Sequence, residues 1–88
     1  MSAYKVVYLK SVEDDLKALD RTVRKRLMDK IDTVLALNPK GLGKALTGSF
    51  AGFWRYRIGD YRVIYKISEH EILICIARIG HRKEIYRS

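Results

Sequence analysis

Three arginines around one tight turn are the residues best suited to chemistry in this chain. Arg55, Arg57 and Arg62 flank Gly59-Asp60, a dipeptide that predicts a two-residue hairpin loop. Because side chains alternate between the faces of a strand, this loop would place Arg57 directly opposite Arg62, with Arg55 on the diagonal. Like charges directly opposite each other destabilise a sheet, so we expect an anion to bind between them.

The same register separates aromatic from basic residues. Trp54, Tyr56, Tyr61 and Tyr65 all fall on the face opposite the arginines. Their shared face predicts packing in the core rather than stacking on nucleic-acid bases. A plainer reading of the arginines stays open, namely a solvated sheet face that repels other sheets.

Arginines and a tyrosine are sufficient for phosphate chemistry if the substrate is RNA, because the ribose 2′-hydroxyl supplies the nucleophile. Arg82 joins the three arginines as a candidate to hold the phosphate and stabilise the charge of the five-coordinate transition state. Tyr86 is the candidate general base, if nearby cations lower its pKa, and His81 or an arginine is the candidate acid. Alternatively, Tyr86 packs the tail onto the sheet and His81 is a solvated polar residue.

Composition indicates a folded, basic domain. The chain has 88 residues, 48% of them hydrophobic, and a net charge of +8 from 18 Lys and Arg against 10 Asp and Glu. This length predicts a single domain spanning residues 1–88. Nucleic acid, an acidic protein or an anionic membrane surface would each suit the charge. We expect a cytoplasmic protein, because no apolar run spans a membrane and the start does not resemble a signal peptide.

The basic excess lies in the second half of the chain. Lys40, Lys44, Lys66 and Lys83 are the lysines that we expect to contact RNA. Residues 40–67 contain only one acidic residue, whereas the first third of the chain holds most of the carboxylates. The second half is therefore expected to be the electropositive part.

Other kinds of site find little support. No metal or other cofactor is expected, because the two histidines are far apart and lack partners at ligand spacing. Residues 41–44 lack the spacing of a phosphate-binding loop and are expected to form a flexible connection. Cys75 lies in an apolar run and is expected to be a buried structural residue. Arg78, in the same run, is expected to anchor a carboxylate or carbonyls.

The pattern of elements predicts an α+β fold: an N-terminal strand, a helical hairpin and a three-stranded antiparallel meander in one sheet. Residues 4–9 suit the first strand, which pairs beside one of the later strands. Ser11 is a candidate cap for a short helix, and Asp20 for a longer one that ends at Asn38-Pro39. Strands are expected at 52–58, 61–67 and 71–79, the last in the middle of the sheet with both faces covered.

The chain resembles the RelE/ParE superfamily of bacterial and archaeal toxins, and its RelE branch in particular. The resemblance spans nearly all residues and rests on three blocks, at 46–48, 52–65 and 79–86. It implies a RelE-like microbial ribonuclease fold. By position, Arg55 and Arg57 match the basic pair of the family's second strand, and Arg62, Arg82 and Tyr86 match its later arginines and terminal tyrosine.

The resemblance also implies a function. RelE-like toxins are ribosome-dependent endoribonucleases that cut messenger RNA in the ribosomal A site, and a small antitoxin neutralises them. For this chain the implied partners are the ribosome, messenger RNA and a RelB-like antitoxin with an acidic or amphipathic helical segment. Two alternatives remain: a non-catalytic ParE-like toxin that inhibits DNA gyrase, and a plain polyanion-binding module.

Overall fold

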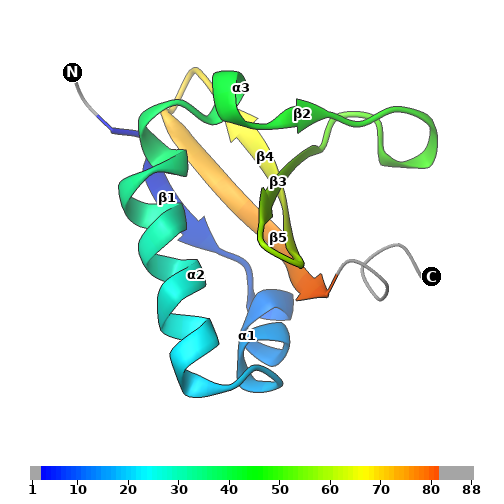
Figure 1. Ribbon diagram of the computed structural model, residues 1–88. Coiled ribbons are helices and arrows are strands. Elements are labelled where there is room, and N and C mark those ends of the chain that lie inside the picture. The colour runs from blue at the N-terminus through cyan, green and yellow to red at the C-terminus, as the bar shows by residue number, and fades with distance from the viewer. Residues whose placement is uncertain (1–2, 82–88) are drawn as a thin grey trace.

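Five strands form one sheet in the order β1-β5-β4-β3-β2, and two helices lie against one of its faces (Figure 1). The structure is a computed structural model that describes residues 3–81. The strands are β1 (Lys5–Tyr8), β2 (Lys44–Ala45), β3 (Trp54–Ile58), β4 (Tyr61–Ser68) and β5 (Leu73–His81). The α-helices are α1 (Lys10–Lys17), α2 (Arg21–Thr33) and α3 (Pro39–Leu42), and short 3-10 turns span Leu35–Leu37 and Gly48–Phe50. The expected α+β fold with one sheet is confirmed.

The predicted meander is correct, with one strand missed. The expected strands at 52–58, 61–67 and 71–79 correspond to β3, β4 and β5, which pair antiparallel in that order. β1 pairs with β5 in parallel, beside the meander as expected. β2 was not predicted, because a strand of two residues is too short to show any alternation.

Of the two expected helix caps, one is confirmed and the other is wrong. The Asp20 side chain accepts a hydrogen bond from the Thr22 backbone N–H at 3.1 Å and caps α2. α1 begins one residue before Ser11, with Leu9 as its N-cap. The Ser11 hydroxyl instead donates to the Ala77 carbonyl of β5 at 3.3 Å, so it ties α1 to the sheet.

The connection after α2 is ordered and includes a helix, contrary to the expected flexible segment. Asn38 accepts a hydrogen bond from the Gly41 backbone N–H at 3.1 Å, and Pro39 occupies the first turn of α3. Proline is well suited to that position, since its missing N–H would have no helical partner there. The buried Tyr65 hydroxyl donates to the Pro39 carbonyl at 2.7 Å and anchors α3 to β4.

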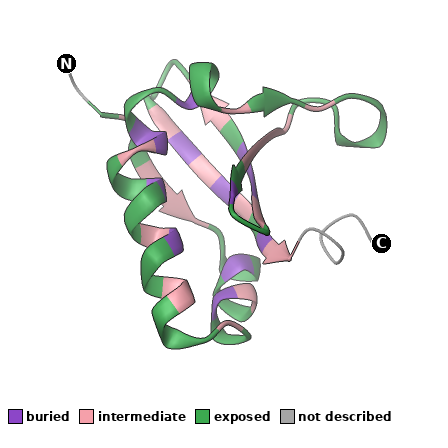
Figure 2. Ribbon diagram, in the orientation of Figure 1, coloured by how far each residue is buried: buried purple, intermediate pink, exposed green. Residues whose placement is uncertain are grey.

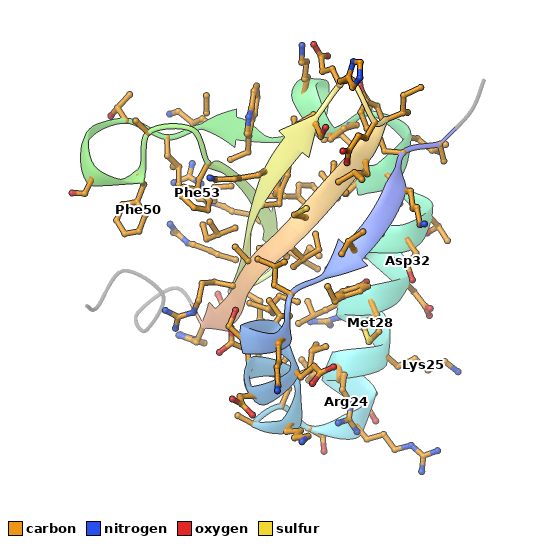
Figure 3. All side chains as sticks on the ribbon, turned by 180° about the vertical axis from the view of Figure 1, so that it is seen from behind. Arg24, Lys25, Met28, Asp32, Phe50 and Phe53 are labelled. Atoms are coloured by element: carbon orange, nitrogen blue, oxygen red, sulfur yellow. The ribbon has the colours of Figure 1, made fainter. Side chains whose placement is uncertain are left out.

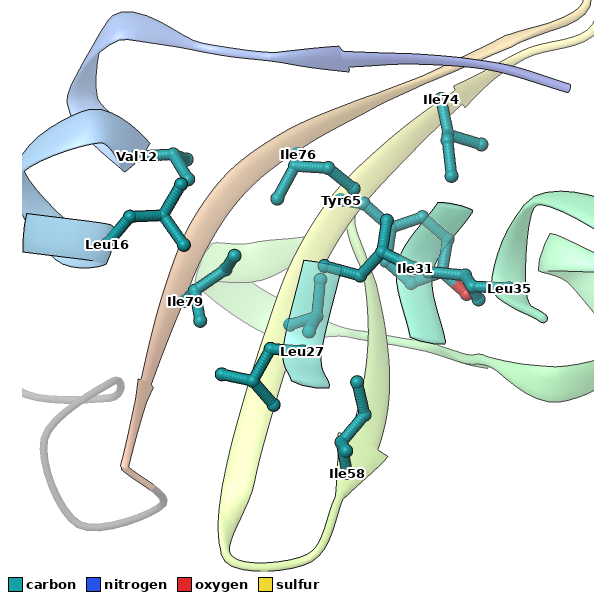
Figure 4. Packing of buried hydrophobic residues seen from close by; sticks show 11 residues of the cluster. Val12, Leu16, Leu27, Ile31, Leu35, Ile58, Tyr65, Ile74, Ile76 and Ile79 are labelled. Atoms are coloured by element: carbon teal, nitrogen blue, oxygen red, sulfur yellow. The ribbon is translucent and has the colours of Figure 1, made fainter. Parts of the chain in front are cut away.

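The hydrophobic core lies between the two long helices and the sheet (Figure 4). Leu27 and Ile31 of α2 and Val12 of α1 are fully buried there, as are Ile74 and Ile76 of β5. Both helices therefore cover the same face of the sheet. Figure 2 shows this layering as purple positions where helices meet strands and green positions on the outer sides of the helices.

The expectation that β5 is covered on both faces is wrong. β5 does lie inside the sheet, between β1 and β4. Ile74 and Ile76 point into the core, but Leu73, Cys75 and Ala77, which alternate with them, are only half-buried. The free thiol of Cys75 is thus on the side of the sheet that the helices leave uncovered, here called the open face.

Buried Tyr65 and half-buried Tyr8 predict how stability depends on pH. Burial raises the pKa of Tyr65, and burial together with the hydrogen bond that Tyr8 donates to Asp32 raises the pKa of Tyr8. The folded chain thus holds both phenol protons more tightly than the unfolded chain, whose tyrosines titrate near pH ~10. Below that pH, the ionisation of these two groups should not change the free energy of unfolding. Above it, the free energy of unfolding should fall as the pH rises.

Urea denaturation of the Tyr65→Phe variant tests this expectation. The variant should lose about 1 to 2 kcal/mol at neutral pH, because the Pro39 carbonyl loses its partner. Its stability should also fall less steeply than that of the wild type above pH ~10. Tyr61→Phe is the control, since Tyr61 is only half-buried. An unchanged alkaline slope in Tyr65→Phe would contradict the assignment.

Candidate nucleic-acid interface

Basic side chains from three neighbouring strands share the open face. Lys44 of β2 pairs with Arg55 of β3, and Arg57 of β3 pairs with Arg62 of β4. Residues paired across strands lie on the same face, as do residues two apart along a strand. Lys66, four residues after Arg62, therefore belongs to the same side. These five cations of β2, β3 and β4 form one basic surface on the open face.

The β3–β4 hairpin has the expected register. Gly59 and Asp60 form the loop, and Gly59 adopts a φ of 61°, which glycine tolerates best. Ile58 faces Tyr61 and Arg57 faces Arg62. In an antiparallel ladder the residues beside such a loop exchange hydrogen bonds, so Arg57 and Arg62 form the next, more closely spaced pair, with Cα atoms about 4.5 Å apart. The predicted like-charge pair is therefore present.

Acidic residues are segregated from this surface. None of the five strands in the described part of the chain contains an Asp or Glu. The carboxylates between residues 3 and 81 lie in α1 and α2, at the Asp20 cap, and in the turns that hold Asp60, Glu69 and Glu71. The sheet layer is therefore positive, and the negative charge lies in the helices and turns.

Phe53 is an aromatic residue on this surface that was not among the predicted site residues. It precedes Trp54 and so alternates with Arg55 and Arg57 rather than with the core aromatics. The ammonium of Lys66 lies 4.6 Å from the centre of its ring, within the range of a cation–π contact. Figure 3 shows Phe53 and Phe50 on the loop between β2 and β3. The alternation of residues along the strand was the signal that could have identified Phe53.

The aromatic residues assigned to the core do pack there. Trp54, Tyr56 and Tyr61 are partly buried against the core, and Tyr65 is fully buried. Their role is structural, as the register predicted.

His81 lies on the other side of the sheet from the arginines. It pairs with Tyr61, and their rings meet edge to face at 5.9 Å between centroids. Together with Asp15 of α1 and Leu19 of the connection between α1 and α2, these rings line a recess on the helix side. A shift in register near Ile64 and Tyr65 leaves one extra residue in β5 and reverses its alternation, which placed His81 there.

Two charged residues have structural partners. Arg78 donates from Nε to the Asp15 carboxylate at 3.3 Å, and the Ile79 backbone N–H donates to the same oxygen at 3.0 Å. The expected anchoring role of Arg78 is confirmed. Lys40 of α3 forms an ion pair with Glu69, and this hydrogen bond raises the pKa of Lys40. Glu69 follows β4, so Lys40 lies at the opposite end of that strand from Arg62.

Several predicted site residues lie outside the described part of the chain. These are Arg82, Lys83 and Tyr86. Their assigned roles stay predictions.

Among residues 3–81, no three His, Cys, Asp or Glu side chains gather as metal ligands would. No helix in that range has the length and apolar character needed to cross a membrane.

Comparison with known proteins places the chain in a family. Residues 6–86 match the family model of the ParE toxin of the type II toxin–antitoxin system parDE. Toxin RelG of Mycobacterium tuberculosis is 30% identical over 84 residues, covering 96% of this chain and 97% of the relative. Toxin RelE of the same organism is 31% identical, covering 96% of this chain and 87% of the relative.

The fold agrees with these matches. The crystal structure of the toxin–antitoxin complex RelBE2 from Mycobacterium tuberculosis contains a chain that superposes with a TM-score of 0.89 at 27% identity, covering 96% of this chain and 97% of that one. Family model, relatives and structure all span almost the whole sequence. The chain therefore belongs to the RelE/ParE superfamily of type II toxin–antitoxin toxins.

Proposed function

We propose that this toxin is a ribosome-dependent endoribonuclease that cleaves messenger RNA in the ribosomal A site and so inhibits translation in the cytoplasm. The observation that carries the proposal is the pairing of Arg57 with Arg62, next to Arg55, in a sheet whose strands between residues 3 and 81 contain no Asp or Glu. Two cations in direct opposition cost stability, and a bound phosphate would relieve their repulsion. A solely structural sheet gains nothing from that arrangement.

The arginines would act electrostatically and without a metal ion. The ribose 2′-hydroxyl attacks the adjacent phosphorus, the bond to the 5′-oxygen of the next nucleotide breaks, and a 2′,3′-cyclic phosphate remains. Negative charge increases on the non-bridging oxygens in the transition state. Guanidinium groups of Arg55, Arg57 and Arg62 are fixed on two paired strands, so they can form fork-shaped hydrogen bonds to these oxygens with little reorganisation.

Proton transfer is assigned to residues near the C-terminus. Tyr86 is the proposed general base for the 2′-hydroxyl, and Arg82 supports the phosphate with the other arginines. His81 remains a candidate acid for the leaving 5′-oxygen, but its contact with Tyr61 puts it on the helix side of the sheet. An arginine of the open face is the alternative proton donor, although guanidinium is a weak acid.

An antitoxin is the proposed protein partner. The structural relatives include complexes named RelBE2 from Mycobacterium tuberculosis and RelE–RelB from Pyrococcus horikoshii. The open face offers positive charge and the half-buried apolar residues Cys75 and Ala77. An acidic, amphipathic helical segment of a RelB-like antitoxin would match both features and compete with RNA.

Primer extension on translated messages tests the proposed reaction. Induction of the wild-type toxin should produce cuts at fixed positions within codons, and only in messages that are being translated. Tyr86→Phe should reduce the cuts about 100-fold or more, because general-base catalysis is lost. Absence of cuts with the wild type, while growth is still inhibited, would exclude this function.

The ParE description of the matching family model supports one alternative, inhibition of DNA gyrase without catalysis. A gyrase inhibitor would leave messages intact. It would also cause relaxed plasmid DNA to accumulate and would retain gyrase in a pull-down. The same induced culture therefore distinguishes the two functions.

A further inference from the structure

A second group of cations lies where α2 passes the edge of β3. A recess of about 300 Å³ opens there between the helix and the hairpin. It is lined by Arg26 and Lys30 of α2 and by Tyr56, Arg57, Ile58 and Gly59 of the hairpin. These described lining residues include no carboxylate, and the two from α2, Arg26 and Lys30, are cations. Asp29 does not line this recess; it lines a neighbouring groove of α2, which Arg26 and Lys30 also line.

The edge of β3 beside this recess is free of a strand partner within the described chain. β2 pairs only with Trp54 and Arg55, so it ends before Arg57. Ile58 and Tyr61 flank the hairpin loop and exchange hydrogen bonds, so the N–H and C=O of Arg57 point away from β4 toward the free edge. Arg57 therefore directs its side chain to the open face and its backbone to the recess.

The two helix cations are also directed toward the hairpin. One terminal nitrogen of the Arg26 guanidinium lies 3.8 Å from the position that a Cβ on Gly59 would occupy. Arg26 and Lys30 are four residues apart, so they lie on the same side of α2, where like charges disfavour each other. Neither belongs to the Lys40–Glu69 or Arg78–Asp15 ion pair. Both are exposed and able to bind an anion.

We propose that this recess binds a backbone phosphate of the RNA strand, a different phosphate from the one held on the open face. A phosphate there would meet the Arg26 guanidinium, the Lys30 ammonium and the Arg57 N–H, which are the usual donors to nucleic-acid backbones. The Arg57 carbonyl can accept a hydrogen bond from a ribose 2′-hydroxyl, which favours RNA over DNA. The strand would cross the edge of β3 from the open face to the helix side.

This inference rests on the proposed function, because that function makes RNA the ligand. An acidic peptide is the competing occupant. Strand addition by a peptide needs several successive free N–H and C=O groups, whereas this edge offers them at Arg57 alone between β2 and the loop. A single residue with a free N–H and C=O, close to two cations, suits a phosphate better than an added peptide strand.

The experiment compares two matched double variants of the full chain. Arg26→Gln/Lys30→Gln removes the recess cations. Arg21→Gln/Lys25→Gln removes the same residue types at the same spacing on α2, outside the recess, and all four residues are exposed. Fluorescence anisotropy measures binding of a labelled single-stranded RNA, and of DNA of the same sequence, across a series of salt concentrations.

The recess variant should bind RNA about tenfold more weakly at low salt, with a salt slope lower in magnitude by about 0.7, as expected for one lost phosphate contact on a single strand. The matched variant should keep the wild-type slope, and wild type should prefer RNA to DNA. Equal losses in both variants, or none, would overturn the proposal. Binding of polyglutamate that depends on Arg26 and Lys30, with RNA binding unchanged, would assign the recess to an acidic peptide instead.

Primer extension separates this inference from the proposed reaction. If translated messages are cut but the recess variant binds RNA as the wild type does, the recess assignment is wrong and the reaction stands. If messages are not cut but RNA binding depends on Arg26 and Lys30, the reaction is wrong and the RNA site stands.

Discussion

Replacing Arg62 by alanine is expected to reduce messenger RNA cleavage on the ribosome by about 100- to 1000-fold, the usual effect of removing one preorganised donor to a transition-state oxyanion. Arg62 lies opposite Arg57 in the closely spaced pair of the hairpin, where a bound phosphate can contact both. Single-turnover primer extension with programmed ribosomes measures the effect. Wild-type cleavage by Arg62→Ala would exclude the arginine pair as the catalytic site.

Arg62→Ala should affect the free energy of unfolding much less than the rate of messenger RNA cleavage. Removal of Arg62 also removes its repulsion with Arg57, so we expect a change in stability within about 1 kcal/mol in either direction. Arg62→Lys keeps the charge but loses the forked geometry, and its rate should fall between those of wild type and Arg62→Ala. Arg21→Ala, an exposed arginine on α2, serves as the control and should cleave normally. A loss of rate that follows a loss of folding would contradict a catalytic role.

The hairpin could be predicted in detail because a short loop determines the register of both strands. Once Gly59 and Asp60 form the loop, every cross-strand pair from Ile58 and Tyr61 outward follows. The like-charge pair and the separate aromatic face were therefore readable from sequence alone. The same alternation would have placed Phe53 with the arginines, had it been applied one residue further.

Features that depend on irregular backbone or on distant segments were not predictable in this way. The extra residue in β5 reverses the alternation after Ala77 and moves His81 to the helix side, and no local sequence signal marks it. The recess brings Arg26 beside Gly59, and only the packing of α2 against the sheet determines that neighbourhood. Helix caps are also ambiguous, since Ser11 is a good cap by type but bonds to β5 instead.

The largest expected loss of stability follows from Leu27→Ala. Leu27 of α2 is fully buried in the core cluster between the helices and the sheet (Figure 4). Truncation removes apolar contact and leaves a cavity, so we expect a loss of about 3 to 5 kcal/mol. For a domain of this size each kcal/mol lowers the melting temperature by about 4 to 8 °C, so thermal unfolding followed by circular dichroism should show a fall of at least about 12 °C.

Leu37→Ala makes the same chemical change at a side chain that is 60% exposed, so it is the matched control. Its cost should stay within about 0.5 kcal/mol, because little apolar surface leaves the core and no cavity forms. Trp54→Ala should fall between the two, since Trp54 is only partly buried against the core. If Leu27→Ala and Leu37→Ala unfolded at the same temperature, α2 would not be packed on the sheet as described, and the recess beside β3 would lose its helix wall.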